Sequence, residues 1–251
     1  MKFEEIFKYT YKSVGREIGL DVKYVNGKMV CTPFEPDDPR YNVDMTMPSM
    51  PMVYLCRADE FDFFQPLIDD GVLTIDQMHR ATERYLLGKT KSGIPMFWMI
   101  DHRGEPLDAH IGDGWISQIL KKREPLLEYW QVRHCLFGEH LLAGNSSSVA
   151  IVESERTAVI LSELLPENIW LAYAYPSNIT PLLMAPLQGR TVTIFPYTDP
   201  YLSNFLFFQD FIGQVRRLYD INLHIDTTLE DHATESQKSR CIDILDFILE
   251  S

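Results

Sequence analysis

Three carboxylates that follow short apolar stretches in the second half of the chain are the residues best placed for chemistry. Glu153 follows "VAIV", Asp199 follows "TVTIF" after a short loop, and Asp226 follows "INLHI". In an open α/β sheet, ligands bind beyond the carboxyl ends of the strands, so acids at these positions can converge. Their oxygens suit Mg²⁺, but carboxylates also stabilise the first turn of a helix. Both a metal site and a capping role are therefore open.

The elements that would position these acids alternate between apolar strands and helices. Strands are predicted at 149–152, 168–174, 191–195 and 221–225. Helices fall between them, and one final helix is predicted over 235–249. This alternation is typical of a parallel sheet that is covered on both faces. The chain is therefore predicted to be an α/β protein with a parallel-sheet C-terminal domain over residues 145–251.

The residues before this domain show a smaller, mixed α+β pattern. Residues 1–57 predict a helix over 3–18, a hairpin around Asn26-Gly27 and a linker over 33–51. Asn-Gly is the strongest two-residue hairpin signal. The polar stretch "AGNSSS" at 143–148 marks the next boundary.

Residues 58–144 predict a mixed α+β region with an antiparallel meander. Its clearest strand is "MFWMID", in which Met96, Trp98 and Ile100 alternate as one buried face should. Core packing is therefore expected for these side chains rather than a platform for stacking bases.

Composition and charge exclude several classes of protein. No apolar run approaches the roughly 20 residues that span a bilayer, and the start has no signal-peptide pattern, so a cytoplasmic protein without a membrane partner is expected. No CxxC pair supports a zinc ribbon. The net charge is −13, and the densest basic run is "KKR" at 121–123. Nucleic-acid binding by the isolated chain is not expected, because it depends on clustered Lys and Arg.

Two segments, "VAIVESERTAVILSELLP" and "GRTVTIFPYTDP", together resemble the Toprim fold, the catalytic module of bacterial primases and topoisomerases. In particular, the sequence is similar to primase-like proteins of mobile elements that carry a Toprim-like C-terminal half. The resemblance covers roughly residues 80–251. It implies a glutamate after the first strand, here Glu153, as the candidate catalytic acid/base. It also implies a metal-binding Asp-x-Asp after a later strand, which falls on Tyr197-Thr198-Asp199.

The resemblance therefore implies a degenerate site in which Tyr197 is vestigial and replaces the first aspartate. Asp199 and Asp226 are the remaining candidate metal ligands. Magnesium relies on each of its few carboxylates, so either no cofactor or one weakly bound Mg²⁺ is expected. Two-metal phosphoryl transfer is not expected from this set of ligands.

Three functions remain open. The first is a non-catalytic or weakly active accessory factor of mobile-element replication, with a replication or mobilisation protein as its partner. The second is an active Mg²⁺-dependent nucleotidyl-transfer or nuclease enzyme that uses Glu153 and Asp199. The third is an acidic protein-interaction module.

The resemblance also makes a geometric prediction. The strands 149–152 and 191–195 should be parallel and adjacent, with the carboxylates of Glu153 and Asp199 within about 10 Å of each other. Tyr197 should lie in the same cleft with its hydroxyl hydrogen-bonded, because a buried phenol without a partner is costly.

Overall fold

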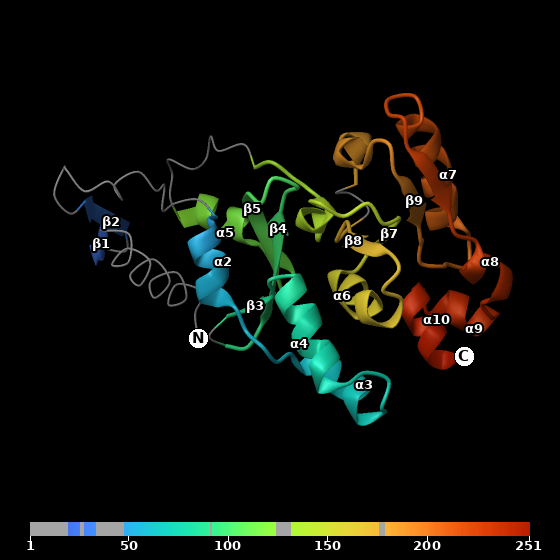
Figure 1. Ribbon diagram of the computed structural model, residues 1–251, viewed down its shortest axis with the longest axis horizontal. Helices are drawn as coiled ribbons and strands as arrows, with labels where there is room; N and C mark the ends of the chain where they lie inside the picture. Colours follow the sequence, from blue (N-terminus) through green and yellow to red (C-terminus); the bar gives the residue numbers. More distant parts are fainter. Residues whose placement is uncertain (1–19, 26–27, 34–47, 91, 124–131, 176–178) are drawn as a thin grey trace. The chain divides into compact units, whose positions relative to one another are not determined.

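The computed structural model describes residues 20–25, 28–33, 48–90, 92–123, 132–175 and 179–251 (Figure 1). The helix predicted over 3–18 and most of the predicted linker lie outside these ranges. The chain forms two compact units: Met1–Phe61 with Thr82–His134, and Asp62–Ala81 with Cys135–Ser251. This division differs from the predicted boundaries at 57 and 144, because residues 62–81 and 135–144 group with the parallel sheet.

The first unit contains two antiparallel sheets. In the smaller one, β1 (Leu20–Val25) pairs with β2 (Lys28–Pro33), which confirms the predicted hairpin strands. The larger sheet follows the order of the chain: β3 (Gly88–Lys89), β4 (Pro95–Ile100), β5 (Pro106–Ile111) and β6 (Gly114–Trp115). This sheet is the predicted meander. In the described part of this unit, helices α2 (Met50–Cys56) and α5 (Ile116–Arg123) accompany the sheets.

Strand β4 is more deeply buried than its predicted alternation requires. Trp98 is fully buried, and Met96 and Ile100 are almost so. Phe97 and Met99, on the opposite face, are buried as well. The aromatic side chains of this strand are therefore core residues, as expected.

The second unit is built on a parallel sheet. Its strands are β7 (Val149–Val152), β8 (Ile169–Ala172), β9 (Thr191–Ile194) and β10 (Asn222–Ile225). Their order in the sheet is β10-β9-β7-β8, and every pairing is parallel. Strands β7 and β9 are therefore neighbours, as predicted. Ile151 lies opposite Ile194 in this pair. The chain has an α/β fold with one parallel sheet and an antiparallel meander.

Helices supply the rest of the core around the parallel sheet. Alternate residues of β7, Val149 and Ile151, share one core with Phe208 and Val215 of α7 (Ser203–Val215). This core also contains residues of η3 (Glu139–Leu142) and η4 (Pro181–Leu187). Helix α6 (Glu155–Leu164) packs against β7 and β8. Side chains alternate between the two faces of a strand. The residues next to Val149 and Ile151 in β7 therefore face the side of the sheet opposite α7.

Shorter helices complete this unit. Before the sheet, the chain forms η1 (Asp62–Phe64), α3 (Gln65–Asp69) and α4 (Ile75–Arg84), whose last residues belong to the first unit. After β10 come α8 (Thr228–His232), α9 (Glu235–Ser239) and α10 (Ile244–Glu250). Among the residues described, no helix combines the length and apolar character needed to cross a membrane.

The single final helix predicted over 235–249 is wrong. The chain breaks between α9 and α10, where Cys241 has a left-handed backbone conformation with φ of 54°. Asp243 then starts α10 through a capping box with Asp246. The capping side chains accept hydrogen bonds from N–H groups that the start of a helix leaves unpaired. This stabilises a new helix start at Asp243, although the apolar residues keep helical spacing across it.

Candidate functional site

Glu153 lies directly after β7, an inner strand of the parallel sheet. Its side chain is half-buried and makes no hydrogen bond or ion pair with a residue that the structure describes. Burial, followed by the negative charges of Asp243 and Glu155, raises the pKa of Glu153 to about 7. A carboxyl group with this pKa is partly protonated at neutral pH, which suits a group that gives or takes a proton.

Asp243 is the second acid near Glu153. Its carboxylate accepts hydrogen bonds from the Thr157 hydroxyl at 2.5 Å and from the Asp246 backbone N–H at 3.0 Å. Burial raises the pKa of Asp243 more than these bonds lower it. The bond to Thr157 ties the start of α10 to the first turn of α6, which begins two residues after Glu153. Two carboxyl groups with raised pKa values therefore share this part of the sheet edge.

Two tyrosines lie near Glu153. Tyr173 follows β8, is only 3% exposed, and its buried hydroxyl has no partner of hydrogen-bond geometry among the described residues. Burial raises the pKa of Tyr173, and the negative charges of Glu153 and Tyr197 raise it further, while the nearby Asn204 side chain lowers it. The pKa of Tyr197 is raised by burial and then by Glu153 and Asp199. Tyr197 therefore lies near both acids, as predicted.

The predicted hydrogen bond of the Tyr197 hydroxyl is not found. The side chain of Tyr197 is half-buried, and its hydroxyl bonds to no described residue. Only its backbone is held, through a 3.0 Å bond from the Asn204 side-chain amide to the Tyr197 carbonyl. The prediction rested on the free-energy cost of burying a phenol without a hydrogen-bond partner. That cost is small here, because a half-buried phenol keeps access to solvent.

Asp199 caps the start of α7. One carboxylate oxygen accepts the Tyr201 N–H at 2.8 Å, and the other accepts the Asn204 N–H at 2.9 Å. Burial raises the pKa of Asp199, but the hydrogen bonds from Asn204, Ser203 and Tyr201 outweigh it, so the pKa is lowered. Asp199 is therefore an ionised carboxylate whose two oxygens are both engaged by backbone.

Asp226 lies apart from Glu153 along the sheet edge. It follows β10, and β9 separates β10 from β7. Neighbouring strands are about 4.8 Å apart, so the backbones of the two acids are roughly 10 Å apart. The Asp226 carboxylate accepts the Thr228 N–H at 2.9 Å at the start of α8.

Two of the candidate metal ligands at this edge, Asp199 and Asp226, already bond to backbone N–H groups. Within the described ranges, no three His, Cys, Asp or Glu side chains are grouped so that they could hold a metal ion. Asp199 and Asp226 are both engaged in capping, and Tyr197 contributes a phenol whose pKa is raised. Mg²⁺ prefers charged and neutral oxygen ligands in octahedral geometry, and a protonated phenol is not one of its usual ligands.

Comparison with known families adds one match. The profile of DUF6371, a domain of unknown function, matches residues 62–198, which is more than half of the chain. The chain belongs to the DUF6371 family. No curated protein matches it.

The DUF6371 match contains only part of the candidate site. Glu153, Tyr173 and Tyr197 lie inside it, whereas it ends one residue before Asp199 and does not reach Asp243. Glu153 and Tyr197 follow neighbouring parallel strands and lie at one sheet edge, as the sequence predicted, whereas Tyr173 and Asp243 were not predicted near them. The spacing of Asp243 and Asp246 was the signal for a new helix start with an acid at its first position.

Proposed function

We propose that this chain is a degenerate Toprim-like protein that acts as a non-catalytic or weakly active accessory factor for primase-like replication proteins of mobile elements. The observation that carries the proposal is the state of Asp199, the remaining acid of the implied Asp-x-Asp pair. Both of its oxygens bond to the backbone at the start of α7, and Tyr197 stands where the other acid would be. The position that should hold a metal instead builds a helix cap.

The arrangement of the sheet supports the same proposal. The first and third strands of the unit, β7 and β9, are adjacent and parallel, so the residues that follow them share an edge. That is the placement which the resemblance implies for Glu153 and the Asp-x-Asp position. This placement supports the proposal of a Toprim-like site that has lost its metal ligands.

One observation favours a second candidate, an active enzyme. Glu153 has a pKa of about 7, and its side chain bonds to no described residue, which are the properties of a general acid or base. In this alternative, Glu153 moves the proton and Asp199 is the metal ligand of a nucleotidyl-transfer or nuclease reaction.

Binding of Mn²⁺ to the whole chain, measured by calorimetry or by the electron-spin signal of the free ion, tests the proposal. We expect the wild type to bind Mn²⁺ weakly or not at all at millimolar concentrations. Tyr197→Asp should bind it measurably more tightly, because the substitution restores a second carboxylate.

A matched control is Leu218→Asp, which adds the same charge at an exposed position between the end of α7 and the start of β10, at the opposite edge of the sheet from Glu153. It should leave Mn²⁺ binding unchanged. Tight binding by the wild type that is lost in Glu153→Gln contradicts the proposal and supports the enzyme. Co-purification of a replication protein that survives nuclease treatment then tests the accessory role.

A further inference from the structure

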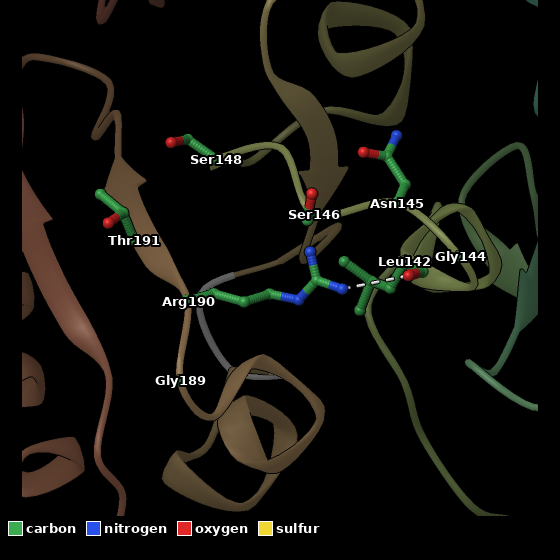
Figure 2. Close-up of a pocket in the computed structure, with 8 residues that line it drawn as sticks. All are labelled: Leu142, Gly144, Asn145, Ser146, Ser148, Gly189, Arg190 and Thr191. Carbon is green, nitrogen blue, oxygen red and sulfur yellow. Dashed lines mark hydrogen bonds between the residues drawn. The ribbon is translucent and has the colours of Figure 1, made fainter.

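A pocket lies at the opposite edge of the parallel sheet from Glu153. It is formed by the loop that leads into β7 and by the residues at the start of β9 (Figure 2). Its volume is about 520 Å³, which is within the range of small-molecule sites. The residues of the lining that carry polar side chains are Asn145, Ser146, Ser148, Arg190 and Thr191. No acid lines the pocket, although the chain has 36 Asp and Glu against 23 Lys and Arg.

Arg190 supplies an uncompensated positive charge to this pocket. Its guanidinium extends from the segment before β9 toward the loop, as Figure 2 shows, and donates to the Leu142 carbonyl at 3.0 Å. A second, longer bond of 3.4 Å reaches the Ser147 carbonyl. Both acceptors are neutral, and no carboxylate in the described part of the chain pairs with Arg190. Because a guanidinium stays charged and has five N–H donors, it keeps both charge and donors for a ligand.

The loop adds further hydrogen-bond donors. The Asn145 side-chain oxygen accepts the Ser147 N–H at 2.9 Å, which leaves the amide nitrogen as a donor. The hydroxyls of Ser146 and Ser148 are exposed and bond to no residue that the structure describes. The Thr191 hydroxyl accepts a 3.3 Å bond from Asn222, so its own proton is also available.

We propose that this pocket binds a small phosphate-bearing molecule and that Arg190 contacts the phosphate. A planar guanidinium fork matches two phosphate oxygens, and charge-assisted bonds of this kind are the stronger ones in proteins. The hydroxyl and amide donors of the loop donate hydrogen bonds to the third phosphate oxygen. The cavity is larger than a phosphate, so the rest of the molecule lies in the same pocket. This site is separate from the Glu153 edge and does not depend on the function proposed for it.

Calorimetry on the whole chain at low salt tests the proposal, with AMP, inorganic phosphate and adenosine as probes. We expect AMP to bind, phosphate to bind more weakly, and adenosine not to bind. Arg190→Gln should weaken AMP binding by at least about tenfold, the size of one charge-assisted hydrogen bond. Arg156→Gln is the matched control, since it removes an exposed arginine in the first turn of α6. It should bind AMP as the wild type does.

A second variant covers the possibility that Arg190→Gln disturbs the loop. Ser148→Asp leaves the bonds of Arg190 in place and adds a negative charge to the lining, so it should also weaken AMP binding. The proposal is overturned if neither AMP nor phosphate binds at millimolar concentration, or if adenosine binds as tightly as AMP. It is also overturned if both variants bind AMP like the wild type. A single-stranded oligonucleotide that binds more than tenfold tighter than AMP at this site rejects the small-molecule assignment.

Discussion

Among single residues, Glu153 and Asp199 show how position decides the chemistry of a carboxylate. Both lie after inner strands of the same sheet and have opposite pKa shifts. Asp199 faces the free N–H groups at the start of α7, which stabilise its charge. Glu153 instead meets burial and the charge of Asp243, which favour its neutral form. The acid able to exchange a proton near neutral pH is therefore Glu153.

The raised pKa of Glu153 predicts a pH-dependent stability. Its pKa rises from 4.5 to about 7 on folding, so the folded chain holds this proton more tightly than the unfolded chain. The free energy of unfolding should therefore fall as the pH rises from about 4.5 to 7. A shift of this size corresponds to about 3 kcal/mol, which solvent access to the half-buried group reduces to on the order of 1 kcal/mol.

Glu153→Gln isolates this contribution because the amide cannot ionise. Thermal unfolding should give the variant and the wild type similar stability at pH 5, and the variant should be more stable at pH 8. Glu167→Gln, which alters an exposed carboxylate on the loop before β8, should show no such difference. A variant that is equally or less stable than the wild type at pH 8 would show that Glu153 is not destabilised by its surroundings.

At the scale of the elements, the alternation of apolar strands and helices was sufficient to predict the parallel sheet, whereas the adjacency of β7 and β9 was predicted only from the resemblance. The break between α9 and α10 was not predicted. The apolar residues of 235–249 keep helical spacing across it, and that spacing hides the left-handed turn at Cys241. The spacing therefore places Asp243 inside a helix and does not predict its closeness to Glu153. A contact between a helix start and a strand end depends on tertiary packing, which local spacing does not encode.

The capping role of Asp199 gives a prediction about α7. Asp199→Ala should lower the free energy of unfolding by about 1 to 2 kcal/mol, the usual cost of losing a helix cap. Chemical denaturation without added metal measures this directly. Asp226→Ala should cost less, because the Asp226 carboxylate accepts a single hydrogen bond of 2.9 Å, from the Thr228 N–H of a five-residue helix. Equal losses would contradict the larger contribution of Asp199, and a loss at Asp199 that appears only with Mg²⁺ present would mean that Asp199 is chiefly a metal ligand.

For the whole molecule, charge is the property that most limits its partners. The net charge of −13 favours a basic protein as partner over a phosphate backbone, and it agrees with either an accessory factor or an interaction module. The pocket at Arg190 does not change the expectation for nucleic acids. One arginine can bind one phosphate group, whereas a nucleic acid needs several cations in a row.

We therefore expect no stable complex with single- or double-stranded DNA at physiological salt. Each phosphate contact by Lys or Arg releases counterions, so a chain without a basic stripe has little of this free energy to gain. Fluorescence anisotropy with labelled 30-nucleotide probes, read at low and at physiological salt, measures both affinity and its salt dependence. Because the acidic surface repels the backbone, lowering the salt should not produce the steep rise in affinity seen with basic proteins. Sub-micromolar binding that weakens steeply with salt would require several phosphate contacts and would place the chain among nucleic-acid-binding proteins.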